Sequence, residues 1–214
     1  MIGPEEQTGG RAASDLPWPG VPEAPVVSAD GSVGTDQLFR ITVVSTGGTI
    51  SKTYDQHSAA MRNEEPVAVR IIRSLRLNST LVKFRNLLNR DSLRLSDADR
   101  RKIIRSVRVS ASRNDAVVVL HGTDTMAETA EALLAKLPTP RVPIIFTGAM
   151  TPHVVEGSDG RQNVTESLFA CRMLSPGVYI VFHGRALRCP GVEKDHATLT
   201  FRRRTALPPP EDRS

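Results

Sequence analysis

The stretch AVVVLHGTDTM, Ala116–Met126, is the strongest indication of the fold in this 214-residue chain. It takes an apolar, mostly β-branched run directly into a glycine and a threonine-rich turn. A second stretch, ITVVSTGGTI at Ile41–Ile50, has the same order of strand, glycine turn and threonine. Continuous apolar runs are typical of parallel strands that are buried on both faces. Because parallel strands end at the same edge of a sheet, the sequence predicts that the two threonine turns meet in one crevice.

Strands and helices alternate around these two stretches. The expected strands are Phe39–Ser45, Leu81–Arg85, Ala116–Leu120, Pro143–Thr147 and Val178–Phe182. The expected helices are Pro66–Leu75, Asp97–Ala111, Thr125–Lys136 and Asn163–Met173. Ser96 is placed to cap the second helix, whose buried face contains Ile103 and Val107. This alternation predicts a single doubly wound α/β domain with a mostly parallel sheet flanked by helices.

The composition changes at both ends of the chain. Residues 1–37 are rich in Pro and Gly and are expected to be a disordered leader. Residues 38–200 are expected to form the folded domain, and residues 201–214 a basic, Pro-rich tail. No secretory signal is visible, and apolar runs of about five residues are too short to span a bilayer. We therefore expect a cytoplasmic protein with no membrane partner.

Basic residues are concentrated in one part of the sequence. The formal net charge is +5, and residues 70–113 hold thirteen basic but only three acidic residues. Such a stretch could bind nucleic acid or an acidic surface. However, Phe84 is its only aromatic residue and no nucleic-acid motif is present. The pattern favours a solvated, arginine-rich helical face over a nucleic-acid interface.

The two cysteines, Cys171 and Cys189, are too few for a disulfide framework and lack the spacing of metal ligands. We expect buried, inert thiols. Nothing in the sequence implies a metal or an organic cofactor.

The turn Thr46–Thr49 has two glycines that permit positive φ and close backbone approach. The N–H of Gly48 is therefore a candidate donor to an anion or an oxyanion, and Thr49 is a candidate nucleophile. The alternative is a tight turn in which Thr49 only caps the next segment. No phosphate-binding loop pattern is present.

The turn after Leu120 offers more chemistry. Thr123 or Asp124 could simply cap the following helix. Alternatively, Asp124 holds a cationic group while Thr123 positions a nucleophilic oxygen and the N–H of Gly122 faces the substrate. A threonine hydroxyl needs a neighbouring base, and Lys194, one of only five lysines, follows the last expected strand. Taken alone, Lys194 would be a surface lysine.

A third strand ends in small residues, Thr147–Pro152, where Ala149 would let a ligand approach the backbone. A plain strand-ending turn explains them equally well. The segment Ser158–Asn163 is typical of a helix N-terminus, and we interpret Asp159 as structural.

In this order, the motifs TGGTI, HGTDTM-x-ETA, FTGAM and SDG-x-x-N resemble those of the bacterial-type L-asparaginases. These are threonine amidohydrolases that convert asparagine to aspartate and ammonia. The resemblance covers residues 38–197, the amino-terminal catalytic domain of that family, and implies a short single-domain form without the carboxy-terminal domain. It also implies a homodimer or homotetramer and no cofactor.

Residue by residue, the resemblance implies that Thr49 is the nucleophilic threonine and that Thr123 is the second threonine. Asp124 matches the aspartate that binds the substrate α-amino group. Lys194 matches the lysine that deprotonates Thr123 or a bound water. Which threonine attacks first, or whether water attacks directly, is left open by the sequence.

The chain departs from the family pattern in two further places. Asn89 and Arg90 stand where a serine and a glutamine bind the substrate carboxylate, and they are followed by Asp91 and Ser92. Arg90 could bind this carboxylate with Asp91 and Ser92 beside it, or Arg90 and Asp91 could simply cap the turn before the helix. Tyr54, the candidate catalytic tyrosine, lies closer to Thr49 than the family's tyrosine does.

The expected function is hydrolysis of L-asparagine, with a side activity on L-glutamine. Two alternatives remain open at this stage. One is a non-catalytic protein that binds amides or amino acids, and the other is amide hydrolysis on a larger, acidic or RNA-linked substrate.

Overall fold

The computed structural model describes residues 38–55, 60–63 and 67–204, with side chains described for residues 38–50 and 67–204. A six-stranded sheet has the order β4-β1-β5-β6-β7-β8, parallel throughout except for the antiparallel strand β8. Its strands are β1 (Phe39–Gly47), β4 (Thr80–Arg90), β5 (Ala116–Leu120), β6 (Pro143–Thr147), β7 (Gly177–Phe182) and β8 (Arg185–Arg188). Two small antiparallel sheets pair β2 (Lys52–Asp55) with β3 (Ala60–Asn63) and β9 (Val192–Asp195) with β10 (Thr200–Arg203).

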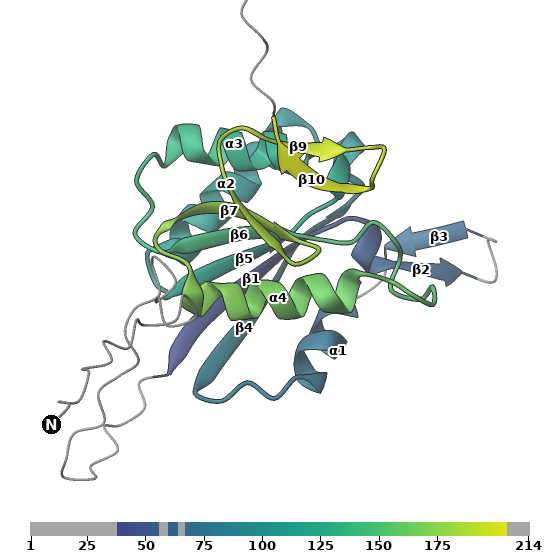
Figure 1. Cartoon of the computed structure of the whole chain (residues 1–214), viewed down its shortest axis with the longest axis horizontal. Coiled ribbons are helices and arrows are strands. Elements are labelled where there is room, and N and C mark those ends of the chain that lie inside the picture. The colour runs from purple at the N-terminus through teal and green to yellow at the C-terminus, as the bar shows by residue number, and fades with distance from the viewer. Residues whose placement is uncertain (1–37, 56–59, 64–66, 205–214) are drawn as a thin grey trace, which may run out of the picture.

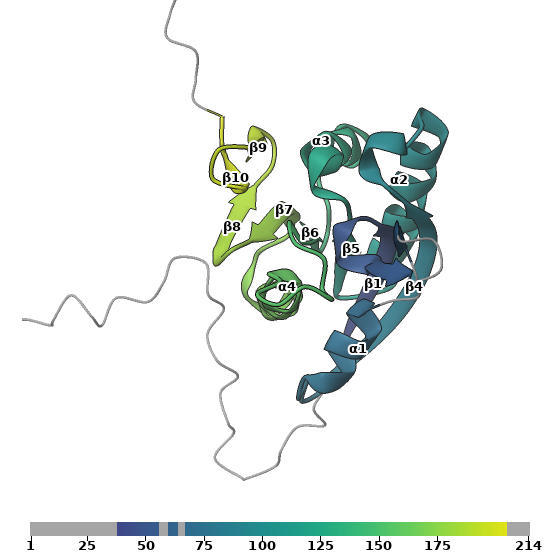
Figure 2. The same cartoon turned by 90° about the vertical axis from the view of Figure 1, so that its right-hand side faces the viewer.

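Helices cover both faces of the six-stranded sheet. The α-helices are α1 (Val67–Ser74), α2 (Asp97–Ala111), α3 (Met126–Lys136) and α4 (Gly160–Met173). Figure 2 shows α1 and α4 on one side of the sheet and α2 and α3 on the other. In Figure 1, β2 and β3 extend beyond the carboxyl end of β1, and β9 and β10 lie above the sheet near α3. The predicted doubly wound α/β domain is confirmed.

The central strands divide the core into two clusters. Val117 and Val119 of β5 are fully buried with α2 and α3, whereas Val118 and Leu120 are buried with α1 and α4. Successive strand residues point to opposite faces, so an unbroken apolar run is what a strand covered on both sides requires.

The boundaries of β5, β6 and α2 are those predicted from the sequence. The predicted cap of α2 is also confirmed. Ser96 Oγ accepts a hydrogen bond from Asp99 N at 3.2 Å, and Ser96 N donates to Asp99 Oδ2 at 3.0 Å. Ile103 and Val107 are buried as expected.

The sequence prediction was wrong where few residues face the core. Strand β4 continues five residues beyond Arg85, because it lies at the sheet edge and tolerates polar residues. Strands β8, β9 and β10 were not predicted, since each is only four residues long and has one buried residue. The expected tail therefore starts later than residue 201, because Phe201 is buried within β10. The proposed leader, residues 1–37, lies outside the described residues.

Candidate active site

The direction of the chain changes beside β1. The chain passes from β1 to β4 on one side, then returns to β5 on the other side of β1. In open α/β sheets, the crevice at such a switch point, beyond the carboxyl ends of the strands, is the usual ligand site. The turns that carry Thr49 and Thr123 follow β1 and β5, so they lie at this point.

The two turns are in direct contact through glycine. Gly47 and Gly48 have φ values of +100° and +90°, which favour glycine. A Cβ added to Gly48 would lie 2.7 Å from the backbone nitrogen of Gly122. Thr46 Oγ1 also donates to the carbonyl of Leu120 at 3.0 Å. The sequence prediction that the two turns meet is therefore confirmed.

Lys194 extends from β9 to the turn after β5. Its Nζ lies 2.9 Å from Thr123 Oγ1 and 2.6 Å from Asp124 Oδ1. Only 12% of the Lys194 side chain is exposed, and Thr123 is buried. Lys194 is thus not the surface lysine that its sequence neighbourhood alone would suggest.

Strand β9 owes its position to β10. Lys194 is paired in register with Phe201. The Phe201 ring is buried and packs edge-on against Phe182, with 5.1 Å between the centroids. Val192 is fully buried in the same cluster. Burial of these apolar side chains fixes the strand that carries Lys194.

Helix capping does not account for Thr123 and Asp124. The 3-10 helix η4 (Thr123–Thr125) leads into α3, and the cap positions of these two helices are Gly122 and Thr125. Neither position has a side-chain cap hydrogen bond. Thr123 and Asp124 instead accept hydrogen bonds from Lys194.

A buried chain of hydrogen bonds connects this turn to α2 and α3. This chain of hydrogen bonds was not predicted from the sequence. His121 Nδ1 lies 2.8 Å from the carbonyl of Gly122, so Nδ1 carries the hydrogen and donates. His121 Nε2 lies 3.0 Å from Thr129 Oγ1, to which Arg100 Nη1 donates. Burial lowers the pKa of His121 from 6.5 to about 4, opposed by the bond to Gly122 and reinforced by the Arg100 charge. No spacing in the sequence marks this link, because it joins side chains from a turn and from two different helices.

The segment after β4 lies against the same turn. A Cβ added to Gly122 would lie 2.6 Å from Ser92 Oγ. The Ser92 carbonyl accepts a hydrogen bond from Thr125 Oγ1 at 3.1 Å. Ser92 is buried, and its hydroxyl finds no hydrogen-bond partner within the described part of the chain.

Arg90 and Asp91 make local contacts. Arg90 Nη1 pairs with Asp99 Oδ2 at 2.8 Å. Asp91 caps the 3-10 helix η3 (Ser92–Arg94) by accepting from Leu93 N at 3.1 Å. These contacts correspond to the capping alternative left open by the sequence, although both residues lie at the expected edge of the sheet.

The turn after β6 is held by a carboxylate. Asp159 accepts hydrogen bonds from the N–H groups of Met150 and Thr151, at 3.0 to 3.1 Å. Asn163 Nδ2 and His183 Nε2 also bind Asp159 Oδ2, each at 2.9 Å. Burial alone would raise the pKa of Asp159, but these hydrogen bonds outweigh it, and the pKa lies below 3.8. The structural role predicted for Asp159 is confirmed.

Ala149 is buried within this turn, at 1% exposure. The neighbouring residue Gly148 is tightly packed, since an added Cβ would lie 2.3 Å from the carbonyl oxygen of His121. Tyr54 lies on β2, paired with Met61 of β3. The side chain of Tyr54 is outside the described set.

The cysteines are buried, as predicted. Burial raises the pKa of Cys171 and of Cys189 to about 12, which keeps both thiols protonated. Within residues 38–55, 60–63 and 67–204, no three His, Cys, Asp or Glu side chains are grouped to hold a metal ion. No helix of this described portion is both long and apolar enough to cross a membrane.

Comparison with known proteins gives consistent matches. Residues 40–206 match the family model described as Asparaginase, N-terminal. The chain is 32% identical over 161 residues to the L-asparaginase of Thermococcus kodakarensis, which covers 74% of this chain and 48% of that protein. It is also 35% identical over 129 residues to a glutamyl-tRNA(Gln) amidotransferase subunit of Thermoplasma acidophilum, covering 60% and 32% of the two chains.

Solved structures agree with these matches. The thermostable L-asparaginase from Thermococcus kodakarensis superposes with a TM-score of 0.71 at 28% identity, covering 77% of this chain and 51% of that one. A probable cytoplasmic L-asparaginase from Campylobacter jejuni gives 0.62 at 26% identity, covering 74% and 49%. The chain spans about half the length of the asparaginases that it matches, and about a third of the amidotransferase relative.

Proposed function

The chain belongs to the asparaginase family, and we propose that it hydrolyses the side-chain amide of L-asparagine to L-aspartate and ammonia with a threonine nucleophile. L-Glutamine is the proposed side substrate. One extra methylene group usually gives only about 1–3 kcal/mol of discrimination in a binding pocket.

The contact between Lys194 and Thr123 carries this proposal. Lys194 donates to the buried Thr123 hydroxyl at 2.9 Å, so the two groups are within reach for proton transfer once Lys194 has lost a proton. Asp124, at 2.6 Å from the same amine, orients it. In the proposal, Thr123, Lys194 and Asp124 form the proton-transfer group that assists the attacking threonine, Thr49, because a threonine hydroxyl needs a neighbouring base to attack.

The proposed reaction has two halves. The Thr49 hydroxyl attacks the amide carbon, its proton passes to the nitrogen, the C–N bond breaks and ammonia leaves. A water then attacks the acyl-threonine and releases aspartate, and the proton of the water returns to Thr49. The Thr123 hydroxyl and Lys194 hold the water or relay the proton. The N–H group of Gly122 is the proposed donor to the oxyanion. The N–H of Gly48, the other donor expected from the sequence, instead donates to the carbonyl of Arg90 at 3.2 Å.

Substrate binding uses the same edge of the sheet. Lys194 binds Oδ1 of Asp124, so Oδ2 can bind the substrate ammonium group. The Ser92 hydroxyl, buried beside Gly122, is the proposed donor to the α-carboxylate, which would supply the partner it needs. Tyr54 is proposed to line the site, and Arg90 and Asp91 to shape its rim. Ala149 is buried in the core, so its proposed contribution is a small side chain behind the backbone of the turn.

We also propose that the protein is a cytoplasmic homodimer or homotetramer. The crevice at the switch point lies at the edge of the domain, where a second copy of the chain could complete it.

A second candidate function is suggested by the other group of relatives. Several matching proteins are named as subunits of glutamyl-tRNA(Gln) amidotransferase. In this alternative, the same threonine chemistry would act within a complex whose other substrate is linked to tRNA. Salt-sensitive binding of tRNA would favour it.

Ammonia release from L-asparagine and L-glutamine by the purified protein tests the main proposal. Thr49→Ala and Thr123→Ala remove the two proposed hydroxyls. Thr165→Ala is the matched control, because Thr165 is exposed on α4 and its hydroxyl donates to the carbonyl of Arg161 in the same helix. Calorimetric titration with asparagine on each variant measures binding separately from turnover.

We expect turnover on asparagine that collapses in both site variants and persists in Thr165→Ala. Binding of asparagine without turnover by the folded wild-type protein would instead support a non-catalytic amide-binding protein. Absence of both binding and turnover, together with tRNA binding, would support the amidotransferase role.

A further inference from the structure

A groove of about 620 Å³ lies at the end of the molecule opposite the candidate active site. It is formed where α2 and α3 end and where the chain enters β5 and β6. Residues just before these strands, Asn114 and Val142, line it, whereas the candidate site follows their carboxyl ends. A five-residue strand separates the two by about 17 Å.

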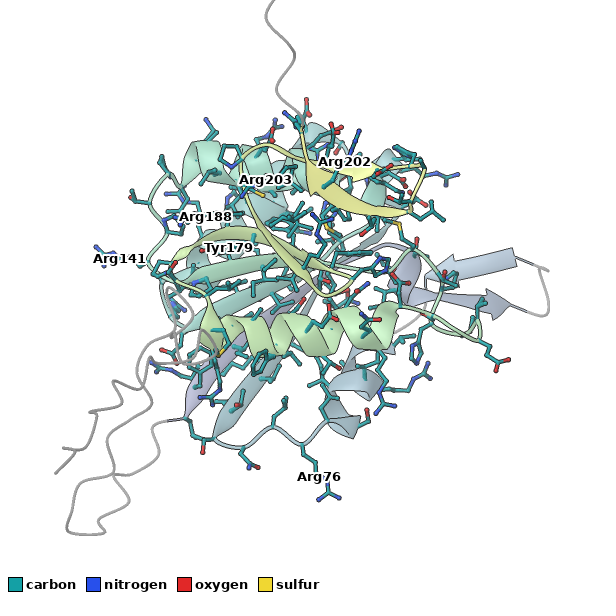
Figure 3. All side chains as sticks on the ribbon, in the orientation of Figure 1. Arg76, Arg141, Tyr179, Arg188, Arg202 and Arg203 are labelled. Atoms are coloured by element: carbon teal, nitrogen blue, oxygen red, sulfur yellow. The ribbon has the colours of Figure 1, made fainter. Side chains whose placement is uncertain are left out.

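Three arginines line this groove. Arg105 and Arg108 come from α2, and Arg141 comes from the loop before β6. Arg141 projects from the edge of the molecule in Figure 3. Across the described ranges, none of the three forms an ion pair, whereas Arg90, Arg100 and other arginines each pair with a carboxylate. The groove therefore presents an uncompensated positive charge.

Arginines near a helix C-terminus often serve only to bind its last carbonyl groups. At the end of α2 that task is done by other groups. Asn114 Nδ2 donates to the carbonyl of Ser110 at 2.8 Å, and Ser112 Oγ donates to that of Val109 at 3.0 Å. At the end of α3, Leu137 N donates to the carbonyl of Leu133 at 2.8 Å. The guanidinium groups are thus not needed as caps.

The walls of the groove are partly apolar. Val109, Ala111, Leu137 and Val142 line it beside the arginines. Pockets for small organic ligands usually measure about 300–1,000 Å³ and combine apolar walls with a few polar groups. The lining contains no aromatic side chain on which a nucleic-acid base could stack.

We infer that this groove binds a small organic phosphate, with at least two negative charges and an apolar ring or chain. The planar guanidinium group matches phosphate oxygens in a bidentate manner and stacks on rings. The apolar walls accept the organic part of the ligand. This binding site is separate from the amide-hydrolysing site and does not depend on the function proposed for it.

Calorimetric titration of the full chain with ADP, in low salt and without metal, tests the inference. Sodium triphosphate, which lacks the organic part, and a single-stranded RNA decamer are titrated in parallel. The variants are Arg105→Gln, Arg108→Gln and Arg141→Gln. Arg76→Gln is the matched control, because Arg76 is exposed beyond α1, at the lower end of Figure 3 and away from the groove.

We expect ADP to bind more tightly than triphosphate, and each groove variant to weaken binding about tenfold while Arg76→Gln leaves it unchanged. Equal binding of ADP and triphosphate would overturn the role of the apolar walls. Equal weakening by Arg76→Gln, no ADP binding at millimolar concentration, or tighter binding of RNA that also depends on Arg76 would overturn the inference as a whole.

Discussion

Two segments reach the same edge of the sheet in this molecule and use their charges differently. After β5, Asp124 and Thr123 are bonded to Lys194, about 70 residues away in the sequence. After β4, Arg90 pairs with Asp99, nine residues away, and Asp91 with the N–H of Leu93, two residues away. Contacts of the second kind stabilise local turns, whereas the first kind forms only when the whole domain folds. A charged side chain at the carboxyl edge of the sheet is therefore a stronger site candidate when its partners are distant in the sequence.

Replacing the distant partner should produce the largest effect. In Lys194→Gln the amine that contacts Thr123 is lost, and we expect kcat for asparagine to fall about 1,000-fold, as for loss of a general base. Lys102→Gln, on the exposed face of α2, should leave kcat unchanged. Steady-state ammonia release measures both. If kcat of Lys194→Gln stays within tenfold of the wild-type value, the contact of Lys194 with Thr123 is structural. The distinction between long-range and local contacts would then not identify catalytic residues.

The pH dependence of the free energy of unfolding should reveal the contribution of the buried His121, which is hydrogen-bonded beside the Thr123 turn. His121 has a pKa of about 4 when folded and 6.5 when unfolded, so only the unfolded chain takes up the proton between these values. The contribution of His121 to the free energy of unfolding is therefore complete above pH 6.5. It falls by about 3 kcal/mol as the pH decreases from 6.5 toward 4.

Urea unfolding of the wild type and of His121→Asn between pH 7 and 4 isolates this contribution. Other titrating groups are common to both proteins and cancel in the difference. Parallel pH curves would show that His121 does not remain neutral in the folded protein, and the buried hydrogen-bond chain would need revision.

The contact between the two glycine turns should be the next most sensitive feature. In Gly48→Ala, the added Cβ meets Gly122 N at 2.7 Å at a φ of +90°, and we expect a loss of about 2 kcal/mol or more. Gly157→Ala has a similar φ, +77°, but nothing within 4 Å of the added Cβ, so it measures the backbone strain alone. Thermal unfolding compares the two. Equal losses would mean that the turns are not packed together.

The smallest effect separates the two residues that compete for the substrate carboxylate. We expect Ser92→Ala to raise KM for asparagine about tenfold, because one charge-assisted hydrogen bond is lost. Arg90→Gln should change KM less than twofold, since Arg90 is half exposed and paired with Asp99. The reverse result would show that Arg90 leaves Asp99 when substrate binds.

Much of the fold could be predicted because its signals are local. The runs at Ala116–Leu120 and Pro143–Thr147 are apolar throughout, and each is a fully buried central strand. The Ser96 cap and the acidic first turn of α2 fixed that helix to the residue. Strands β8 to β10 could not be predicted, because one buried residue in four gives no period.

The candidate site divides in the same way. Its two threonine turns and their meeting at one edge followed from strand order and glycine content. His121, Thr129 and Arg100 did not, because their link crosses from α2 to α3 and has no sequence spacing of its own. The sequence around Thr129 does not indicate that its hydroxyl is buried and hydrogen-bonded.

The central strands, the two glycine–threonine turns and the family of the chain could all be inferred from the sequence, because apolar runs, glycines and motifs are local patterns of a few residues. Lys194 was already matched to Thr123 by the family resemblance, but its burial, its second contact with Asp124 and the pairing of Arg90 with Asp99 became visible only in the folded domain. The position of Lys194 depends on Phe201 and Val192 being buried against the sheet and helices, and burial of this kind is a property of the packed domain.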